Sequence, residues 1–107
     1  MRAILADDEK KICLLLRELV DWESLGIQIV AEAYSGTSAY EKIRRLRPDI
    51  VVTDIRMPGM DGLELIRRLK QEGLETEFII ISGHKSFEYA HSAIQYGVGN
   101  YLLKPLT

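Results

Sequence analysis

Apolar runs typical of strands alternate with amphipathic helical patterns along this chain of 107 residues. The runs at 3–6, 27–33, 50–52, 78–81 and 100–103 predict five strands, and a helical pattern follows each of the first four. A crossover helix is the short way to connect two parallel strands. This order therefore predicts one α/β domain, with a parallel sheet between helices.

Each helical pattern carries an apolar stripe that we expect to face the sheet. Ser35 and Asp61 are suited to cap the second and third helices, and Glu64 follows Asp61 at the spacing of a capping box. The expected inward positions are Ile12, Leu15, Leu16 and Leu19 in the first helix, Ala39, Ile43 and Leu46 in the second, Leu63, Ile66 and Leu69 in the third, and Phe87, Ala90, Ala93 and Ile94 in the fourth.

Composition and charge exclude several classes of protein. The chain has 47% hydrophobic and 28% charged residues, as ordinary globular domains have. A net charge of -2 gives no general attraction to nucleic acid, so we expect no direct DNA binding by this domain. No apolar run approaches the roughly 18 residues of a membrane span, and we expect a cytoplasmic protein without a signal peptide. The single cysteine, Cys13, is expected to be a small core residue.

Polar and charged side chains stand where predicted strands end. Asp7 and Asp8 follow the first strand, Asp54 follows the third, Ser82 the fourth and Lys104 the fifth. In an open parallel sheet with the flavodoxin-like order 2-1-3-4-5, these carboxyl ends share the edge where ligands bind. The order predicts that all five side chains converge there.

The chemistry of this set fits an anion held beside a divalent cation. Hard carboxylate oxygens suit Mg²⁺, and a cation, a metal ion and a hydroxyl around Asp54 suit a phosphoryl group. Taken singly, each residue has a plainer interpretation: Asp7-Asp8 as an acidic pair at a helix start, Asp54 and Ser82 as turn formers, and Lys104 as a surface residue. The shared position at strand ends favours a metal-assisted anion or phosphoryl site.

These residues resemble the receiver domain of two-component response regulators over the whole chain. The resemblance rests on Asp7-Asp8, on Asp54 with the Met-Pro-Gly-Met-Asp-Gly loop at 57–62, on Ser82-Gly83, on Tyr101 and on Lys104-Pro105. It implies a flavodoxin-like (CheY-like) fold and a phosphoacceptor that is not a conventional enzyme. A sensor histidine kinase would donate the phosphoryl group to Asp54.

The resemblance also implies a role for each matching residue. Asp8 and Asp54 would bind Mg²⁺ directly, Asp7 through water, and Arg56 through its backbone carbonyl. Lys104 would pair with the phosphoryl oxygens, across a cis bond to Pro105. Ser82 and Tyr101 would form the switch, because a hydroxyl drawn to the phosphoryl group vacates space into which the tyrosine ring turns.

The same resemblance extends to partners. The insert at 21–26 and the 87–90 segment are similar to receivers attached to AraC-type helix-turn-helix output domains. Repacking of the fourth helix and fifth strand, with Tyr89 and Tyr96 near that surface, would control the output or a homodimer. We interpret residues 1–107 as a receiver domain truncated before its fifth helix, without its output domain, and expect exposed apolar strand surface on one face.

Two residues beside the phosphoryl position depart from the common family pattern. Arg56 and His84 lie two residues beyond Asp54 and Ser82, and we hypothesise that they slow attack by water on the acyl phosphate. Two other functions stay open at this point. An aspartate-nucleophile phosphatase of the haloacid dehalogenase type would need a second Asp where Arg56 stands, and an interaction module would use the same fold unphosphorylated.

Overall fold

The computed structural model describes residues 1–82 and 100–103. Strands and helices alternate in the predicted order. The elements are β1 Arg2–Ala6, α1 Lys10–Leu19, β2 Gln28–Ala33, α2 Gly36–Leu46, β3 Ile50–Thr53, α3 Gly62–Gln71, β4 Glu77–Ser82 and β5 Asn100–Leu103. The fourth predicted helix, with its inward positions, lies outside the described residues, as do Tyr89, Tyr96 and the Lys104-Pro105 bond.

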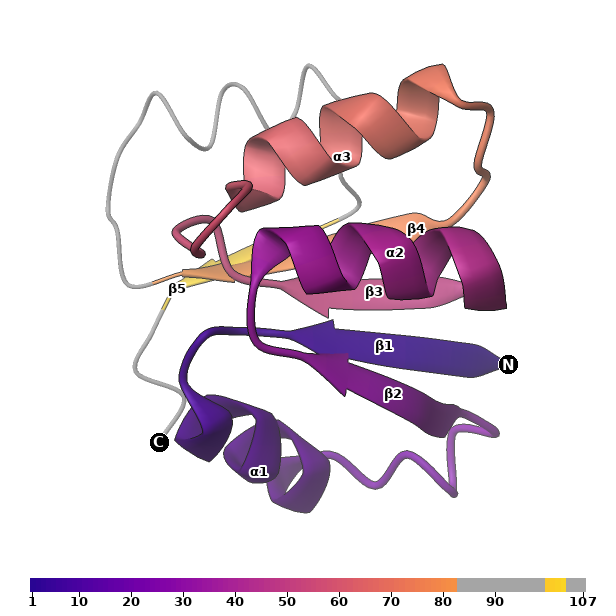
Figure 1. Ribbon diagram of the computed structural model, residues 1–107. Coiled ribbons are helices and arrows are strands. Elements are labelled where there is room, and N and C mark those ends of the chain that lie inside the picture. The colour runs from indigo at the N-terminus through magenta and orange to yellow at the C-terminus, as the bar shows by residue number, and fades with distance from the viewer. Residues whose placement is uncertain (83–99, 104–107) are drawn as a thin grey trace.

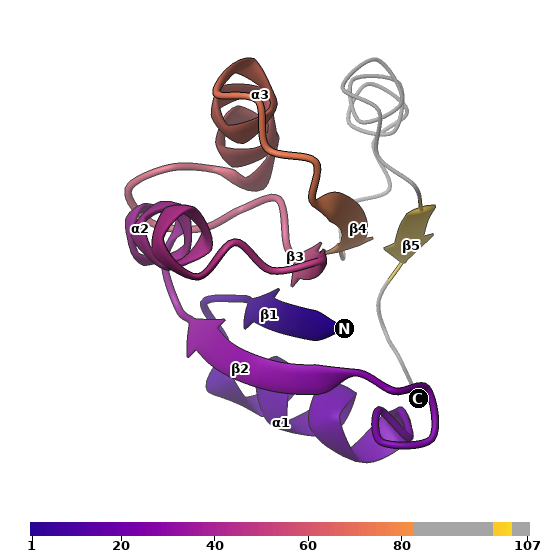
Figure 2. The same ribbon diagram turned by 90° about the vertical axis from the view of Figure 1, so that its right-hand side faces the viewer.

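The five strands form one parallel sheet in the order β2-β1-β3-β4-β5, which confirms the predicted order. α1 lies against one face of the sheet, and α2 and α3 lie side by side against the other (Figures 1 and 2). All strand arrowheads seen in Figure 1 point toward the same edge, where the loops leading into the helices lie. The chain therefore brings its strand-to-helix loops together at one edge.

Side chains that alternate along the strands build a separate core on each face. The α2/α3 face buries Ile4, Val51, Phe78 and Ile80 together with Leu65 of α3. The α1 face buries a smaller cluster, which is Leu5, Val52, Ile81, Cys13 and Leu16. This alternation follows from the two-residue period of a strand, because neighbouring side chains point to opposite faces.

The predicted helix starts are confirmed for α2 and α3. The Ser35 hydroxyl accepts a hydrogen bond from the Ser38 N–H at 3.1 Å, and the Asp61 carboxylate accepts one from the Glu64 N–H at 2.8 Å. Each bond satisfies one of the backbone N–H groups that a helix leaves unpaired in its first turn. α2 ends at Leu46, before Pro48, because a proline disfavours helical backbone at the residue before it.

The predicted inward stripe of α1 is wrong at its end. Cys13 and Leu16 are buried, but the Leu19 side chain is 53% exposed. The indole N–H of Trp22 donates to the Leu16 carbonyl at 3.1 Å, and Trp22 packs against the same cluster. Trp22 therefore closes this end of the core in place of Leu19. In α3, Leu65 is fully buried although we had not placed it on the inner stripe.

The apolar strand surface expected on the α1 face stays a prediction, because the side chains of β5 lie outside the described residues. Among strand residues whose side chains the structure describes, Ile29, Ile50 and Ile79 on this face are partly buried, and the exposed large apolar side chains lie elsewhere. Within the described part of the chain, no helix combines the length and apolar character needed to cross a membrane.

Candidate functional site

Backbone pairing places Asp54 beside Asp7. Ala6 and Thr53 are partners in the β1/β3 register, and the Asp54 N–H donates to the Ala6 carbonyl at 2.9 Å. The Asp7 N–H donates in turn to the Ala33 carbonyl at 3.0 Å. Both acidic residues are nearly buried, with 2% of Asp7 and 6% of Asp54 exposed. They enter the carboxyl edge of the sheet from adjacent strands.

An acidic cluster gathers at the start of α1. Asp7, Asp8 and Glu9 each offer a carboxylate oxygen, and these atoms lie within 4.8 Å of one another. The Glu9 N–H donates to Asp7 Oδ1 at 2.9 Å. The Asp54 carboxylate is not part of this three-residue group, and its Oδ1 accepts a hydrogen bond from the Ile55 N–H at 2.7 Å. Glu9 is not among the site residues predicted from the sequence, although it directly follows the Asp7-Asp8 pair.

The segment after Asp54, residues 55–61, forms a closed loop. The Gly62 N–H donates to the Ile55 carbonyl at 2.6 Å, and a Cβ at Gly62 would overlap the Asp54 carbonyl oxygen. Met57 and Met60 are buried beneath the loop. These contacts fix the backbone that follows the proposed phosphoacceptor.

A hollow of about 340 Å³ opens beside this loop. Its lining is Asp8, Arg56, Met57, Pro58 and Asp61. Such a volume exceeds the roughly 30 Å³ share of one water molecule many times over, so it has room for a hydrated ion and a small anionic group. Asp8 belongs both to the acidic cluster and to the lining of this hollow.

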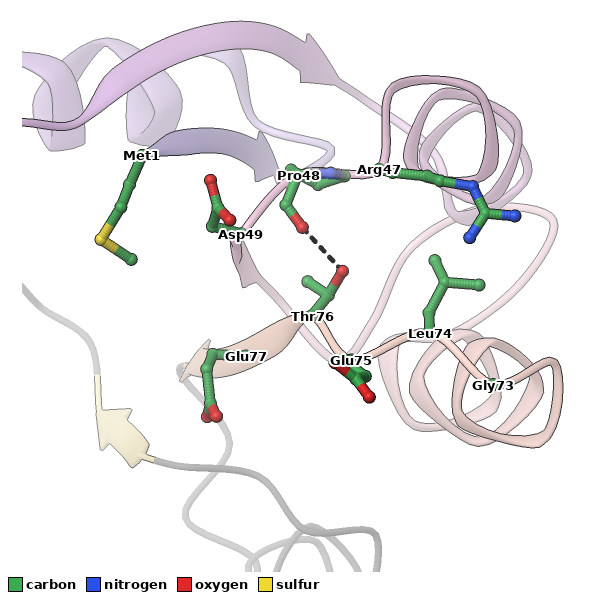
Figure 3. Close-up of a pocket in the computed structure, with 9 residues that line it drawn as sticks. All are labelled: Met1, Arg47, Pro48, Asp49, Gly73, Leu74, Glu75, Thr76 and Glu77. Carbon is green, nitrogen blue, oxygen red and sulfur yellow. Dashed lines mark hydrogen bonds between the residues drawn. The ribbon is translucent and has the colours of Figure 1, made fainter.

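A second hollow, of about 510 Å³, lies at the opposite edge of the sheet. The Thr76 hydroxyl donates to the Pro48 carbonyl at 2.8 Å within it (Figure 3). The lining comes from the amino ends of β1, β3 and β4 and the segments before them, and it is Met1, Arg47, Pro48, Asp49, Gly73, Leu74, Glu75, Thr76 and Glu77. None of the site residues predicted from the sequence lines it.

The other predicted site residues are only partly covered by the structure. Ser82 is the last residue of β4 and pairs with Leu103 of β5, so its backbone reaches the same edge as Asp54. Tyr101 lies in β5 and pairs with Ile80. The side chains of Ser82 and Tyr101, and the whole of His84 and Lys104, lie outside the described part of the structure.

Cys13 lies near the acidic cluster but is suited to the core. Burial raises the pKa of its thiol to about 11, and the negative charges of Glu32 and Asp7 act in the same direction. At neutral pH the thiol is therefore protonated and a poor nucleophile. The prediction of a small core residue is confirmed.

One contact at the site had no signal in the sequence. The Gly36 N–H, at the start of α2, donates to the Pro58 carbonyl at 3.0 Å. The two residues belong to different strand-to-helix connections, so no local pattern links them. The sheet order decides that these connections are neighbours.

Comparison with known proteins identifies the family. The sequence model of the response regulator receiver domain family matches residues 3–107. The uncharacterized transcriptional regulatory protein YesN of Bacillus subtilis is 48% identical over 104 residues, which are 97% of this chain and 28% of that protein. The transcriptional regulatory protein HptR of Staphylococcus aureus is 33% identical over 105 residues, which are 98% of this chain and 41% of that protein. The chain thus spans between a quarter and a half of these relatives.

Solved structures agree with this family. The receiver domain of AraT, a response regulator from Geobacillus stearothermophilus, is 39% identical with a TM-score of 0.90, over 97% of this chain and 81% of that one. A CheX-CheY complex with BeF3 and Mg²⁺ from Borrelia burgdorferi gives 25% identity and a TM-score of 0.90, over 100% and 80%. The chain belongs to the response regulator receiver domain family and is the receiver domain of a two-component response regulator.

Proposed function

We propose that Asp54 is the phosphoacceptor of this receiver domain and that a sensor histidine kinase is the donor. The observation that carries the proposal is the hydrogen bond from the Asp54 N–H to the Ala6 carbonyl, since it sets Asp54 beside Asp7 and Asp8 at the ligand-binding edge of the sheet. Asp54 is nearly buried yet follows directly after β3, where its carboxylate can meet a small reactant.

The donor chemistry of the site fits Mg²⁺. Asp7 and Asp8 bring hard oxygen ligands close together, and crowded carboxylates favour a bound cation. We propose that Asp8, Asp54 and the Arg56 backbone carbonyl hold the ion, with Asp7 acting through water. When bound, Mg²⁺ offsets the negative charge that otherwise opposes attack by one anion on another. The related CheX-CheY complex contains Mg²⁺, which supports this assignment.

In the proposed transfer, an Asp54 carboxylate oxygen attacks the phosphorus of a phosphohistidine. A P–O bond forms as the P–N bond breaks, and the bonding electron pair returns to the imidazole nitrogen. Asp54 then carries an acyl phosphate. The Lys104 ammonium group pairs with the phosphoryl oxygens, and the Ser82 hydroxyl donates a hydrogen bond to one of them.

The output follows from this added charge. A phosphoryl group brings about -1.5 to -2 charge and three acceptor oxygens, which draw Ser82 inward and let Tyr101 turn into the vacated space. The proposed result is a shift between pre-existing states of the surface formed by the fourth helix and β5. That surface would control an AraC-type helix-turn-helix output domain, or a homodimer, in a cytoplasmic transcription regulator. The relatives described as transcriptional regulatory proteins support this direction.

Treatment with acetyl phosphate and Mg²⁺ tests the proposal, with intact-mass spectrometry as the measurement. The wild type should gain one acid-labile phosphoryl group, and Asp54→Asn should gain none. Asp49→Asn is the matched control, because Asp49 lies at the opposite edge, where Oδ2 accepts from the Arg2 N–H at 2.7 Å. Continued turnover of donor would indicate a phosphatase, and an unlabelled wild type would indicate an interaction module.

The lifetime of the labelled protein tests the roles of Arg56 and His84. We propose that these side chains restrict water at the acyl phosphate, and Arg56 lines the hollow beside Asp8. Replacing both residues with alanine should shorten the lifetime of the phosphoryl group. An unchanged lifetime would reject this role without affecting the assignment of Asp54.

A further inference from the structure

The first turn of α2 lies against the loop that follows Asp54. The Gly36 N–H donates to the Pro58 carbonyl at 3.0 Å, and Gly36 is buried. A Cβ at Gly36 would overlap the Met60 carbonyl oxygen and come within 2.8 Å of the Met60 Cβ. A real Cβ cannot approach backbone so closely, so the loop depends on glycine at this position.

A second contact joins the same two segments nearer the surface. Gly59 has φ of +83°, in the left-handed region that favours glycine. The Thr37 side chain lies over it so closely that a Cβ at Gly59 would overlap the Thr37 hydroxyl oxygen. Thr37 itself is exposed and is not needed to fill the core. The contact is therefore one between loop and turn, separate from the packing of the sheet.

Gly36 and Thr37 contact the loop at Pro58, Gly59 and Met60. Arg56, Met57 and Pro58 of the same loop line the hollow that Asp8 also lines. At its end the loop is closed by the Gly62 N–H bond to the Ile55 carbonyl. Since the loop is tied at both ends, we expect a shift at Pro58 or Gly59 to move the backbone around Arg56.

We infer that Gly36 and Thr37 are positioning residues, which hold the 56–60 loop so that the Arg56 backbone carbonyl stays in place for Mg²⁺ and phosphoryl transfer. This inference rests on the proposed function of Asp54. Neither residue touches the reacting atoms. Both act through the loop, and their effect should appear in metal affinity and in the rate of labelling.

The test adds a methyl group at Gly59 and then removes the Thr37 hydroxyl that would obstruct it. Gly59→Ala should slow labelling of Asp54 by acetyl phosphate at least about tenfold, since a misplacement of about 1 Å can cost on the order of 100-fold. The same variant should bind Mg²⁺ more weakly in isothermal titration calorimetry. Adding Thr37→Ala removes the obstructing hydroxyl and should restore part of both losses. Adding Thr37→Val instead keeps an atom of similar size in place of the hydroxyl oxygen. This change should restore neither the labelling rate nor the Mg²⁺ affinity.

Gly26→Ala is the control for backbone strain. Gly26 has φ of +71°, but a Cβ there would meet nothing within 4 Å. This variant should lower the melting temperature while leaving labelling and Mg²⁺ affinity within about twofold of the wild type, because strain far from the loop does not move it. Melting temperatures of all variants show which of them are folded.

The outcomes separate the inference from the function on which it rests. Two results would overturn the inference alone. One is a Gly59→Ala variant that is labelled as fast as the wild type, and the other is equal recovery with Thr37→Ala and Thr37→Val. Absence of Asp54-dependent labelling in the wild type would overturn the proposed function, and the Mg²⁺ affinities would still decide the role of the loop. If Gly59→Ala does not fold, Thr37→Ala alone decides: weakened Mg²⁺ binding supports the inference, and unchanged binding rejects it.

Discussion

At the scale of single residues, the acidic cluster at the start of α1 brings like charges close together. Asp7, Asp8 and Glu9 hold carboxylate oxygens within 4.8 Å of one another, and like charges at this distance repel. The start of α1 offsets part of this repulsion, because the helix dipole favours negative charge there. A bound divalent cation would offset the remainder.

Neutralising one member should therefore separate stability from metal binding. We expect Asp8→Asn to raise the melting temperature in the absence of divalent ions, since it removes one of three like charges. The increase in melting temperature that Mg²⁺ gives the wild type should be largely lost in this variant, because a ligand that binds only the folded state stabilises it. Thermal denaturation at several Mg²⁺ concentrations measures both effects. Equal responses to Mg²⁺ in the two proteins would remove Asp8 from the proposed ligands.

Cys13 should make the stability of the protein depend on pH in the alkaline range. Burial raises the pKa of its thiol from 9.0 to about 11, so the folded state favours the neutral form. The stability that this contributes is complete below pH 9 and is lost as the pH rises through about 11.

Between these pH values, the free energy of unfolding of the wild type should fall more steeply than that of Cys13→Ala. The difference in slope should accumulate to at most about 3 kcal/mol, given a shift from 9.0 to about 11 and 1.36 kcal/mol for each pKa unit. Urea denaturation of both proteins at matched pH measures it. Parallel profiles would show that the thiol titrates alike in the folded and unfolded chain.

At the scale of elements, α2 begins with a cap that also borders the site. The Ser35 hydroxyl accepts a hydrogen bond from the Ser38 N–H, and the next residue, Gly36, contacts the 56–60 loop. The same turn thus starts a helix and supports the loop after Asp54.

Ser35→Ala should lower the free energy of unfolding by about 1 kcal/mol, because one N–H of the first turn loses its acceptor. The midpoint of urea denaturation should fall without a change in the slope m. Ser38→Ala is the matched control, since only the backbone N–H of Ser38 takes part in the cap, and its effect should stay within about 0.5 kcal/mol. Similar losses in the two variants would argue against the cap.

At the scale of the whole molecule, two cores of different size hold the sheet. The larger one lies beneath α2 and α3, and Leu65 is fully buried in it. Leu14 of α1 is 56% exposed on the other side. The same substitution at these two positions therefore probes the packing of the domain.

Leu65→Ala should destabilise the protein by about 2–5 kcal/mol, through lost burial and the cavity left behind. Leu14→Ala should change the free energy of unfolding by less than about 0.5 kcal/mol, because its side chain is largely in water already. Chemical denaturation of both variants provides the comparison. A large loss at Leu14 would mean that another surface covers it in solution.

Several features of the fold could be predicted because their causes are local. The period of apolar residues indicated strands and helices, and Ser35 and Asp61 indicated where two helices begin. The alternation of these elements indicated a parallel sheet, and the flavodoxin-like strand order that we expected for it agrees with the structure. Leu19 was predicted wrongly, because the residue that closes its end of the core is Trp22, which packs back from beyond the helix. Periodicity alone does not describe such a contact.

The chemistry of the site was likewise present in the sequence. Asp7, Asp8 and Asp54 follow strands, and this placement depends only on where the apolar runs stop. The resemblance to receiver domains supplied the proposed roles of those residues and of Ser82, Tyr101 and Lys104. In the structure the carboxylate oxygens of Asp7, Asp8 and Glu9 form one group, and the Asp54 carboxylate is not part of it.

The sequence by itself determined the elements, their order and the residues at the strand ends, because these depend on local propensity and on period. Only the tertiary structure decided which distant segments touch. The contacts of Gly36 with Pro58 and of Thr37 with Gly59 exist because the parallel sheet brings two strand-to-helix connections together at one edge. Such a contact joins residues through space, and no property of either segment alone specifies it.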